Sequence, residues 1–153
     1  MSAHRRRNGL PSAVWVAGLV VVVAFGAGGC GGASPEQQAK DAVCARRADI
    51  AQSVSRLAAP PRSQLQPDRV QNELAAIAID LRVIREQEGK ADATLAQQLR
   101  AAEPAFQQQL GAVLSGLLLG GALSTRGINA DLARGLDQLA ASYRKTLARV
   151  DCS

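Results

Sequence analysis

The chain has very few of the side chains that carry catalysis or bind metals. Its 153 residues include one His, one Trp, one Met and one Tyr, and two Phe. His4 and Trp15 both precede Cys30, so the chain from Cys30 onward has no imidazole and no indole. This part of the chain therefore cannot use imidazole catalysis or His metal ligation. Its only aromatics, Phe106 and Tyr143, are too few for stacking on nucleic-acid bases.

Little of the net positive charge belongs to the body of the chain. Eighteen Lys and Arg against thirteen Asp and Glu give a net charge of +5. Three of the basic residues are at positions 5–7, and no acidic residue precedes Glu36. The remaining charges are nearly balanced and interspersed, which does not make the clustered basic face that nucleic-acid binding requires. We therefore exclude nucleic acid as a partner.

The first residues follow the order of an export signal. The basic residues 5–7 are followed by an apolar run at residues 13–25 and then by small residues. This run is shorter than the roughly 20 apolar residues of a membrane-spanning helix, and its length suits the hydrophobic region of a signal peptide. We therefore expect residues 1–29 to be a removable signal peptide.

The residues at the expected cleavage site resemble the lipobox of bacterial lipoproteins. They read Ala27-Gly28-Gly29-Cys30, with alanine where leucine is usual. The resemblance implies that a lipid is attached to the Cys30 thiol and anchors the protein at the extracytoplasmic face of the cell membrane. Ordinary signal cleavage and an uncleaved anchor are the alternatives. Residues 30–35 are expected to form a flexible tether that holds the helical domain, residues 36–153, within roughly 20 Å of the lipid.

The number of cysteines predicts a disulfide. The chain has three, and an exported protein rarely keeps an odd thiol. If Cys30 carries lipid, Cys44 and Cys152 form the only possible pair. Closing this loop of 108 residues is expected to stabilise the fold by roughly 4 to 5 kcal/mol on the chain-entropy account.

Apolar residues recur at intervals of three and four along most of the chain, which predicts helices. No stretch shows the sustained alternation with β-branched residues that strands require, so the chain is expected to be all-α. The strongest apolar seam comprises Val70, Leu74, Ile77, Leu81 and Ile84.

Caps and helix breakers divide this pattern. The first helix is expected at residues 35–58 with Ser34 as its N-cap, and Pro67 opens the second. Gly89 and Asp92 are expected to form a turn between the second helix and a third that runs to residue 119. A continuous helix through Gly89 is the alternative.

Two further features concern the second half of the chain. Pro104 is expected either to kink the third helix or to begin a fresh segment. A fourth helix is expected with Asn129 as its N-cap, and it should end at Cys152.

The expected disulfide constrains the topology. In an up-down bundle the two chain ends lie together only when the number of helices is even, so a Cys44–Cys152 bond favours four helices over three. We therefore predict an all-α, four-helix up-down bundle closed by one disulfide. A long kinked central helix, residues 67–120, flanked by two helices also brings the cysteines together and remains the alternative.

The spacing of the cysteines and the composition resemble the small helical lipoproteins of mycobacteria and related actinobacteria. Those proteins pair a cysteine early in the first helix with one at the chain end. The matching segments here are residues 42–47, which contain Cys44, and residues 147–152, which follow Tyr143. The resemblance implies a lipid-anchored helical protein of the cell envelope, and it carries no assigned chemistry.

The sequence offers no motif that supports an enzyme. Ser142 and Lys145 fit the S-x-x-K pattern of penicillin-recognising enzymes, but the companion S-D-N and K-T-G motifs are absent. We therefore expect no catalytic residues, metal or cofactor. The prediction is a non-enzymatic envelope lipoprotein that acts as a helical binding or structural module, with an envelope protein or a lipid as partner. A carrier of an apolar or lipid ligand is the alternative.

One segment, residues 113–123, is apolar around its whole circumference. Val113 and Leu117 continue the core stripe, so the other leucines are expected to point elsewhere. They would form an interaction patch of Leu114, Leu118, Leu119 and Leu123. The alternative is that a helix end or the following loop covers them.

Overall fold

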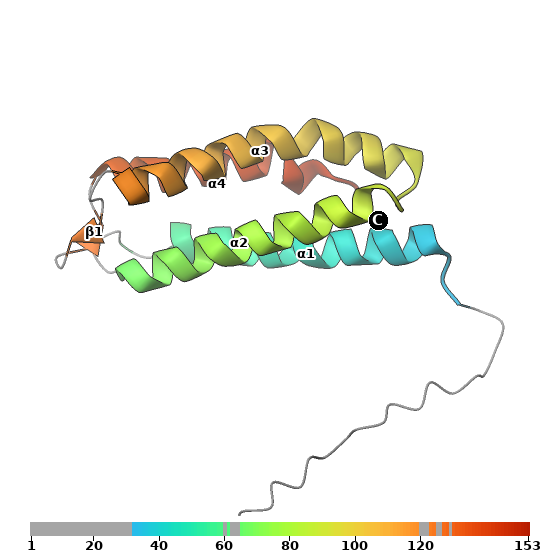
Figure 1. Ribbon diagram of the computed structural model, residues 1–153, viewed down its shortest axis with the longest axis horizontal. Helices are drawn as coiled ribbons and strands as arrows, with labels where there is room; N and C mark the ends of the chain where they lie inside the picture. Colours follow the sequence, from blue (N-terminus) through green and yellow to red (C-terminus); the bar gives the residue numbers. More distant parts are fainter. Residues whose placement is uncertain (1–31, 60, 62–64, 120–122, 125–126, 129) are drawn as a thin grey trace, which may run out of the picture. The chain divides into compact units, whose positions relative to one another are not determined.

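Four α-helices make up most of what the computed structural model describes, which is residues 32–59, 61, 65–119, 123–124, 127–128 and 130–153. In chain order these helices are α1 (Pro35–Ala58), α2 (Pro67–Glu88), α3 (Ala93–Leu119) and α4 (Ala130–Lys145) (Figure 1). A short 3-10 helix, η2 (Leu147–Arg149), follows α4. The predicted all-α class and the number of helices are confirmed.

The start of α1 has the predicted cap. The Ser34 side chain accepts a hydrogen bond from the Gln37 backbone N–H at 3.1 Å. Pro35 takes the first helical position, where a backbone N–H is not needed within the helix. Pro67 begins α2 in the same way, although Gln66 before it makes no side-chain cap.

The predicted turn separates α2 from α3. Asp92 caps the start of α3, because its Oδ1 accepts hydrogen bonds from the Thr94 and Leu95 backbone N–H groups, both at 2.9 Å. Gly89 ends α2 with φ −70° and ψ −9°, so it is not in the left-handed conformation that glycine commonly adopts at a helix end. The alternative of one continuous central helix is therefore wrong. Pro104 lies inside α3, which continues through it as a single helix.

The expectation that the fourth helix continues to Cys152 is wrong. α4 ends at Lys145, and Thr146 has the non-helical angles φ −120° and ψ −92°. The Arg47 guanidinium of α1 donates hydrogen bonds to the carbonyls of Ala148 and Val150. These carbonyls therefore have partners outside a helix, and the chain end can run across α1. The expected N-cap, Asn129, lies outside the described residues.

A two-residue antiparallel pair lies in the connection between α3 and α4. β1 (Leu123–Ser124) pairs with β2 (Gly127–Ile128), with Leu123 opposite Ile128 and Ser124 opposite Gly127. The sequence pattern did not indicate this pair, because two residues per strand are too few to show an alternation.

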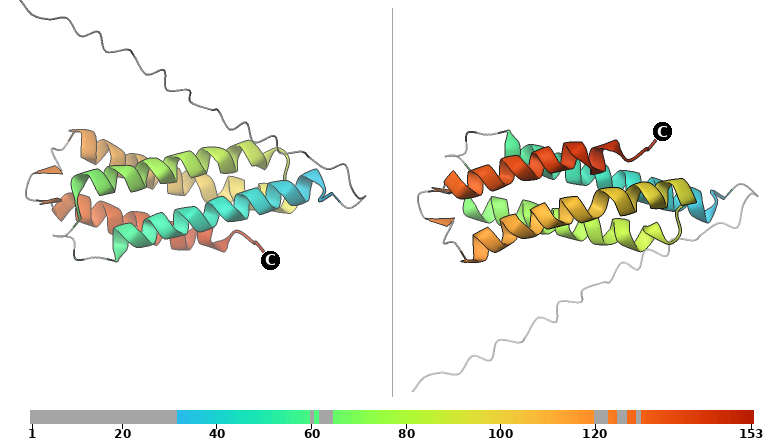
Figure 2. Two further views of the ribbon diagram at one scale, coloured as in Figure 1. Left: turned by 90° about the horizontal axis from the view of Figure 1, so that it is seen from below. Right: turned by 90° about the horizontal axis from the view of Figure 1, so that it is seen from above.

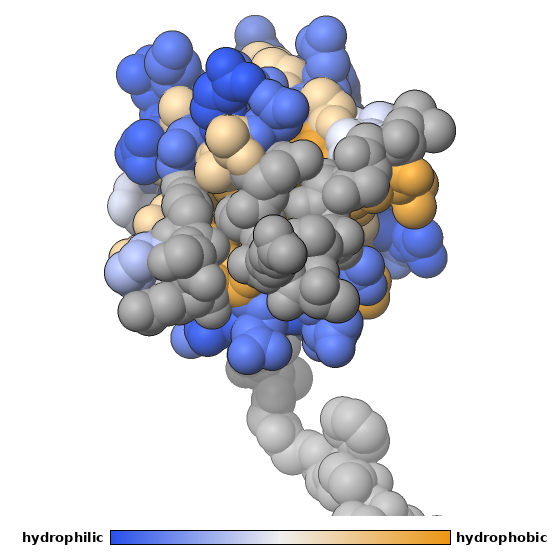
Figure 3. Space-filling model, turned by 90° about the vertical axis from the view of Figure 1, so that its left-hand side faces the viewer, coloured by the Kyte–Doolittle hydropathy of each residue, from blue (hydrophilic) through white to orange (hydrophobic). Residues whose placement is uncertain are grey.

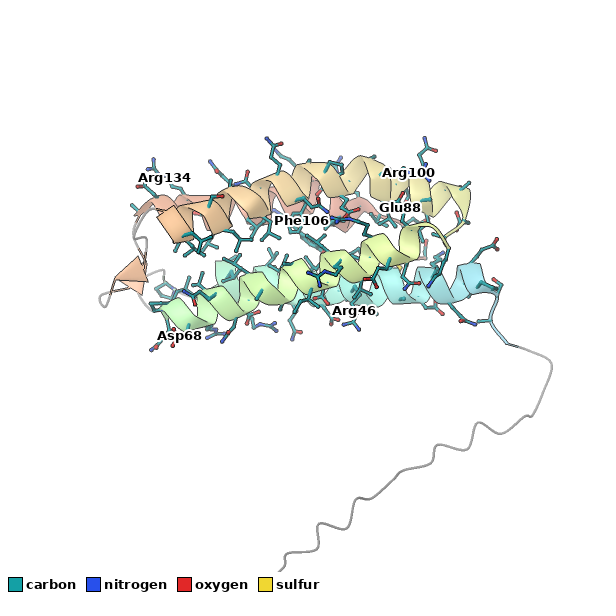
Figure 4. The ribbon with its side chains drawn as sticks, viewed as in Figure 1. Arg46, Asp68, Glu88, Arg100, Phe106 and Arg134 are labelled. Carbon is teal, nitrogen blue, oxygen red and sulfur yellow. A yellow bond between two sulfur atoms is a disulfide. The ribbon has the colours of Figure 1, made fainter. Side chains whose placement is uncertain are left out.

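The helices pack as an up-down bundle. α1 contacts α2 and α4, and α3 likewise contacts both of them. The two views of Figure 2 show the antiparallel neighbours and the chain end beside α1. Phe106 of α3 points into the space between the helices (Figure 4), where its ring meets the Tyr143 ring edge-on at a centroid distance of 6.0 Å.

The core follows the predicted periodicity. All five residues of the α2 seam are buried, as is Leu65, which precedes α2. The other helices contribute aliphatic residues at helical spacing: Val43, Ile50, Val54, Leu57, Leu95, Leu99, Leu110, Val113, Leu132, Leu136 and Leu139. Because each helix buries one stripe, the bundle covers all four stripes at once.

The predicted disulfide is present. Cys44 and Cys152 are joined with an S–S distance of 2.04 Å and a Cα–Cα distance of 5.7 Å. The bond links the third turn of α1 to the chain end across a separation of 108 residues.

We expect a variant with Cys44→Ala and Cys152→Ala to lose about 4 to 5 kcal/mol of unfolding free energy, because the unfolded chain gains the freedom of the open loop. Equilibrium unfolding in urea measures this loss, and reduced wild-type protein should match the variant. Thiol counting on the folded, unreduced protein provides the check. Free thiols at both positions would contradict the disulfide.

Candidate functional site

The expected lipid site precedes the described part of the chain. Cys30 and the expected signal peptide, residues 1–29, lie outside the described residues, so their roles remain predictions. The description begins at Gly32, and α1 begins at Pro35. None of the helices in the described part is long and apolar enough to cross a membrane.

The start of α1 and the chain end meet at one end of the bundle. Lys40 of α1 donates a hydrogen bond to the Ser153 carbonyl. The Asp151 backbone N–H donates to Gln98 Oε1 of α3 at 2.7 Å. The α2–α3 turn lies at this same end (Figure 2). We call it the tether end, because the chain would leave it toward Cys30.

The opposite end, where β1 lies, carries part of the predicted apolar patch. Leu118 is 85% exposed, as the prediction requires. Leu114 is different, because it is partly buried and packs against the core together with Leu117. The side chains of Leu119 and Leu123 lie outside the described residues. Figure 3 views this end, and hydrophobic surface is visible on it.

The expectation for Leu114 is therefore wrong, and helix geometry gives the reason. Leu110, Val113, Leu114 and Leu117 have relative spacings of zero, three, four and seven residues, which place all four on one face of a helix. Leu110 and Val113 are buried, so Leu114 lies at the edge of the same stripe. Only Leu118 remains as a described, exposed member of the patch.

Among the residues that the structure describes, three polar ones are buried between the helices: Ser53, Asp80 and Glu103. Sequence analysis did not identify them, although each occupies a position in the phase of its helix's apolar stripe. Asp80, for example, lies three residues after Ile77 and four before Ile84. A charged residue at such a position was the available signal, since burying a charge requires a partner.

One ion pair, held by two hydrogen bonds, joins α1 to α2 beside Ser53. Arg56 donates from Nε and Nη2 to the two carboxylate oxygens of Glu73, at 2.6 and 2.8 Å. Arg56 also donates to Ser53 Oγ at 3.0 Å. The hydrogen bond from Arg56 holds the pKa of Glu73 below its ordinary value, against the opposing effect of burial. Such a forked pair fixes both distance and direction.

A second ion pair between α1 and α2 differs from the first, because the pKa of its carboxylate is raised rather than lowered. Arg46 Nη1 lies 3.4 Å from Asp80 Oδ1 and 3.2 Å from Asp49 Oδ2. Burial raises the pKa of Asp80, and the nearby Asp49 carboxylate raises it further. Arg46 divides its interaction between Asp49 and Asp80. Its attraction therefore does not fully offset the cost of burying the Asp80 charge.

Two ion pairs join α2 to α3. Arg85 Nη2 lies 2.9 Å from Glu103 Oε1, and Arg100 Nε lies 2.6 Å from Glu88 Oε1 (Figure 4). Like Glu73 and Asp80, these carboxylates are each paired with an arginine of a neighbouring helix. Such pairs help to fix the position of one helix along the next. No group of three or more metal-ligating side chains occurs within the described residues.

The described part of the chain has hollows beside the chain end, of which we compare two. The larger, which we call the C-terminal groove, has a volume of about 230 Å³. Its lining includes Gln98, Ala101 and Ala102 on α3 and Lys145, Arg149 and Val150 on the other side. The smaller hollow, about 80 Å³, lies at the tether end and shares Gln98 with the groove. Its lining also includes Lys40, Asp92 and Asp151.

Comparison with known proteins found no match for the chain. No protein-family model matches it, and neither a curated protein nor a solved structure is significantly similar to it. The resemblance to actinobacterial lipoproteins therefore remains an expectation, and function must be argued from this chain's own residues.

We expect Glu73→Gln to lower stability at pH 7 and Asp80→Asn not to lower it. A lowered carboxyl pKa means that the Glu73 contribution is present above its ordinary pKa and disappears as the pH falls through the lowered value. Glu73→Gln should therefore destabilise the protein at pH 7, and the difference from wild type should shrink in acid.

For Asp80 the sign is reversed. Its raised pKa means that the folded state binds the proton more readily, so this residue lowers stability once the pH exceeds the raised value. Asp80→Asn should be as stable as wild type at pH 7 or more stable, while Arg46 keeps Asp49 as its partner. Urea unfolding at several pH values measures both variants. A large loss of stability in Asp80→Asn would contradict this account.

Proposed function

We propose that the protein is a non-enzymatic lipoprotein, anchored by Cys30 at the extracytoplasmic face of the cell membrane, whose helical bundle binds a protein partner. The observation that carries the proposal is the exposed Leu118 at the end of the bundle opposite the tether end. Leu118 is 85% exposed and belongs to the apolar segment of residues 113–123, and a contiguous apolar surface is typical of an interaction site.

The positions of the two ends support a protein rather than a lipid as the partner of Leu118. α1 has 24 residues, and at about 1.5 Å per residue it is about 36 Å long. A lipid on Cys30 would hold the start of α1 near the membrane. With the bundle upright, the end that carries Leu118 would then face away from the bilayer, where another envelope protein is accessible.

A carrier of an apolar or lipid ligand is the second candidate. The C-terminal groove favours it, because Ala102 and Val150 give this groove an apolar floor. Its volume of about 230 Å³ is below the roughly 300 to 1,000 Å³ of a typical ligand site. A whole lipid would remain largely exposed there, so the binding module is the better-supported proposal.

The anchor is tested by cell fractionation. We expect wild-type protein to partition into membranes and a Cys30→Ala variant to move to the soluble fraction, with the intact mass of wild type showing the added lipid. A Cys30→Ala protein that still partitions wholly into membranes would contradict the anchor.

The partner is tested with Leu118→Gln. Native mass spectrometry of protein extracted from its own membranes should show a bound polypeptide for wild type, and the substitution should weaken its recovery about tenfold. Ile79→Gln is the matched control, because Ile79 is also exposed (59%) but lies on α2. Both variants should keep the wild-type melting temperature. Equal losses in the two variants would contradict a role for Leu118, and a stoichiometric lipid in place of a polypeptide would favour the carrier.

A further inference from the structure

The C-terminal groove combines an apolar floor with a cationic rim. Ala102 and Val150 are buried beneath it, at 7% and 3% exposure. Lys145 and Arg149 line the groove and are exposed. Within the described part of the chain, neither cation makes an ion pair with a carboxylate. They differ in this from Arg46, Arg56, Arg85 and Arg100, which all do.

Two carboxylates that are adjacent in sequence to groove residues, Asp151 and Glu103, have other partners. Asp151 accepts hydrogen bonds from the backbone N–H and the hydroxyl of Ser153, and these hold its pKa below the ordinary value. Glu103 of α3 accepts from Arg85 and from Gln107. The positive charge of Lys145 and Arg149 is therefore not offset by a direct partner, and an anion can contact both.

The groove already has an oriented polar group. The Asp151 backbone N–H donates to Gln98 Oε1, which fixes the direction of this side-chain amide. The Nε2 group of Gln98 can then donate a hydrogen bond to a bound anion. Lysine and arginine are the usual ligands of phosphate in proteins, because their donors meet its oxygens directly.

The size and position of the groove define the ligand further. A volume of about 230 Å³ admits one end of an amphiphile, with its apolar continuation over the Ala101 and Ala102 side of α3. Gln98 also lines the smaller hollow with Lys40, so the groove belongs to the tether half of the bundle. This is the half that a lipid on Cys30 would hold near the membrane surface.

We propose that the C-terminal groove binds the phosphate headgroup of an anionic phospholipid in the membrane to which the protein is anchored. The membrane source of the ligand rests on the proposed anchor, whereas the groove's preference for an anionic amphiphile does not. Headgroup binding would supply a second membrane contact beside the acyl chain, as peripheral proteins commonly require.

The test uses the full chain, purified in a nonionic detergent and titrated with dihexanoyl phosphatidylglycerol, with backbone amides followed by NMR. We expect saturable shifts at Gln98, Ala101 and Arg149. Lys145→Gln combined with Arg149→Gln should raise the dissociation constant about tenfold or more. The control is Arg134→Gln, also on α4 and exposed, which should leave the dissociation constant unchanged within about twofold.

A steric variant tests the groove without changing its charge. Ala101→Phe should fill the groove and weaken binding, whereas Ala105→Phe, at an exposed position one turn along α3, should not. Because all the substituted positions are exposed, the melting temperatures should stay near that of wild type. If the charge variant does not fold, the comparison of the two phenylalanine variants still decides the question.

Three results would overturn the proposal. Inorganic phosphate that binds as tightly as the phospholipid would show a site for free phosphate. Dihexanoyl phosphatidylcholine that binds equally well would remove the role of net negative charge. Unchanged affinity in both the charge variant and Ala101→Phe would place binding elsewhere. Failure of the anchor is detected separately, by the fractionation of Cys30→Ala, which does not depend on the groove.

Discussion

The bond between Cys44 and Cys152 is the constraint on which the arrangement of the chain end depends. It joins α1 to a segment that has already left the helical path at Thr146. Arg47 supports the same junction, since its guanidinium donates to carbonyls of that segment and its own carbonyl accepts from the Tyr143 hydroxyl at 3.2 Å. Together these contacts hold Val150 and Arg149 against α3, and the C-terminal groove exists because of that placement.

The apolar core is built from aliphatic side chains and the Phe106–Tyr143 pair. Side chains of such similar shape favour one alignment of neighbouring helices only weakly over another. The buried carboxylates add a stricter condition. Asp80 and Glu103 need the arginines of neighbouring helices, because an unpaired buried charge is costly. A shift of one helix by a turn would separate these pairs. The ion pairs therefore select one register among packings that would bury similar apolar area.

The two ends of the bundle differ in chemistry, and this difference unites the proposals. The tether half has the disulfide, the chain end and the cationic rim of the groove. The opposite end has the exposed Leu118. An anchored protein with this polarity would meet anionic lipid with one end and a protein with the other.

The sequence by itself determined the helices and the disulfide, because both follow from local or countable features. Ser34 and Asp92 set helix starts by accepting backbone hydrogen bonds, and Pro67 sets one through its fixed backbone angle. Cys44 and Cys152 are the pair that remains if Cys30 carries lipid. Tertiary structure alone decided where the fourth helix stops, since the partners of the Ala148 and Val150 carbonyls come from α1. It also decided the ion pairs and the groove. Each of these depends on side chains far apart in the sequence, and periodicity within one helix does not specify which neighbour a residue meets.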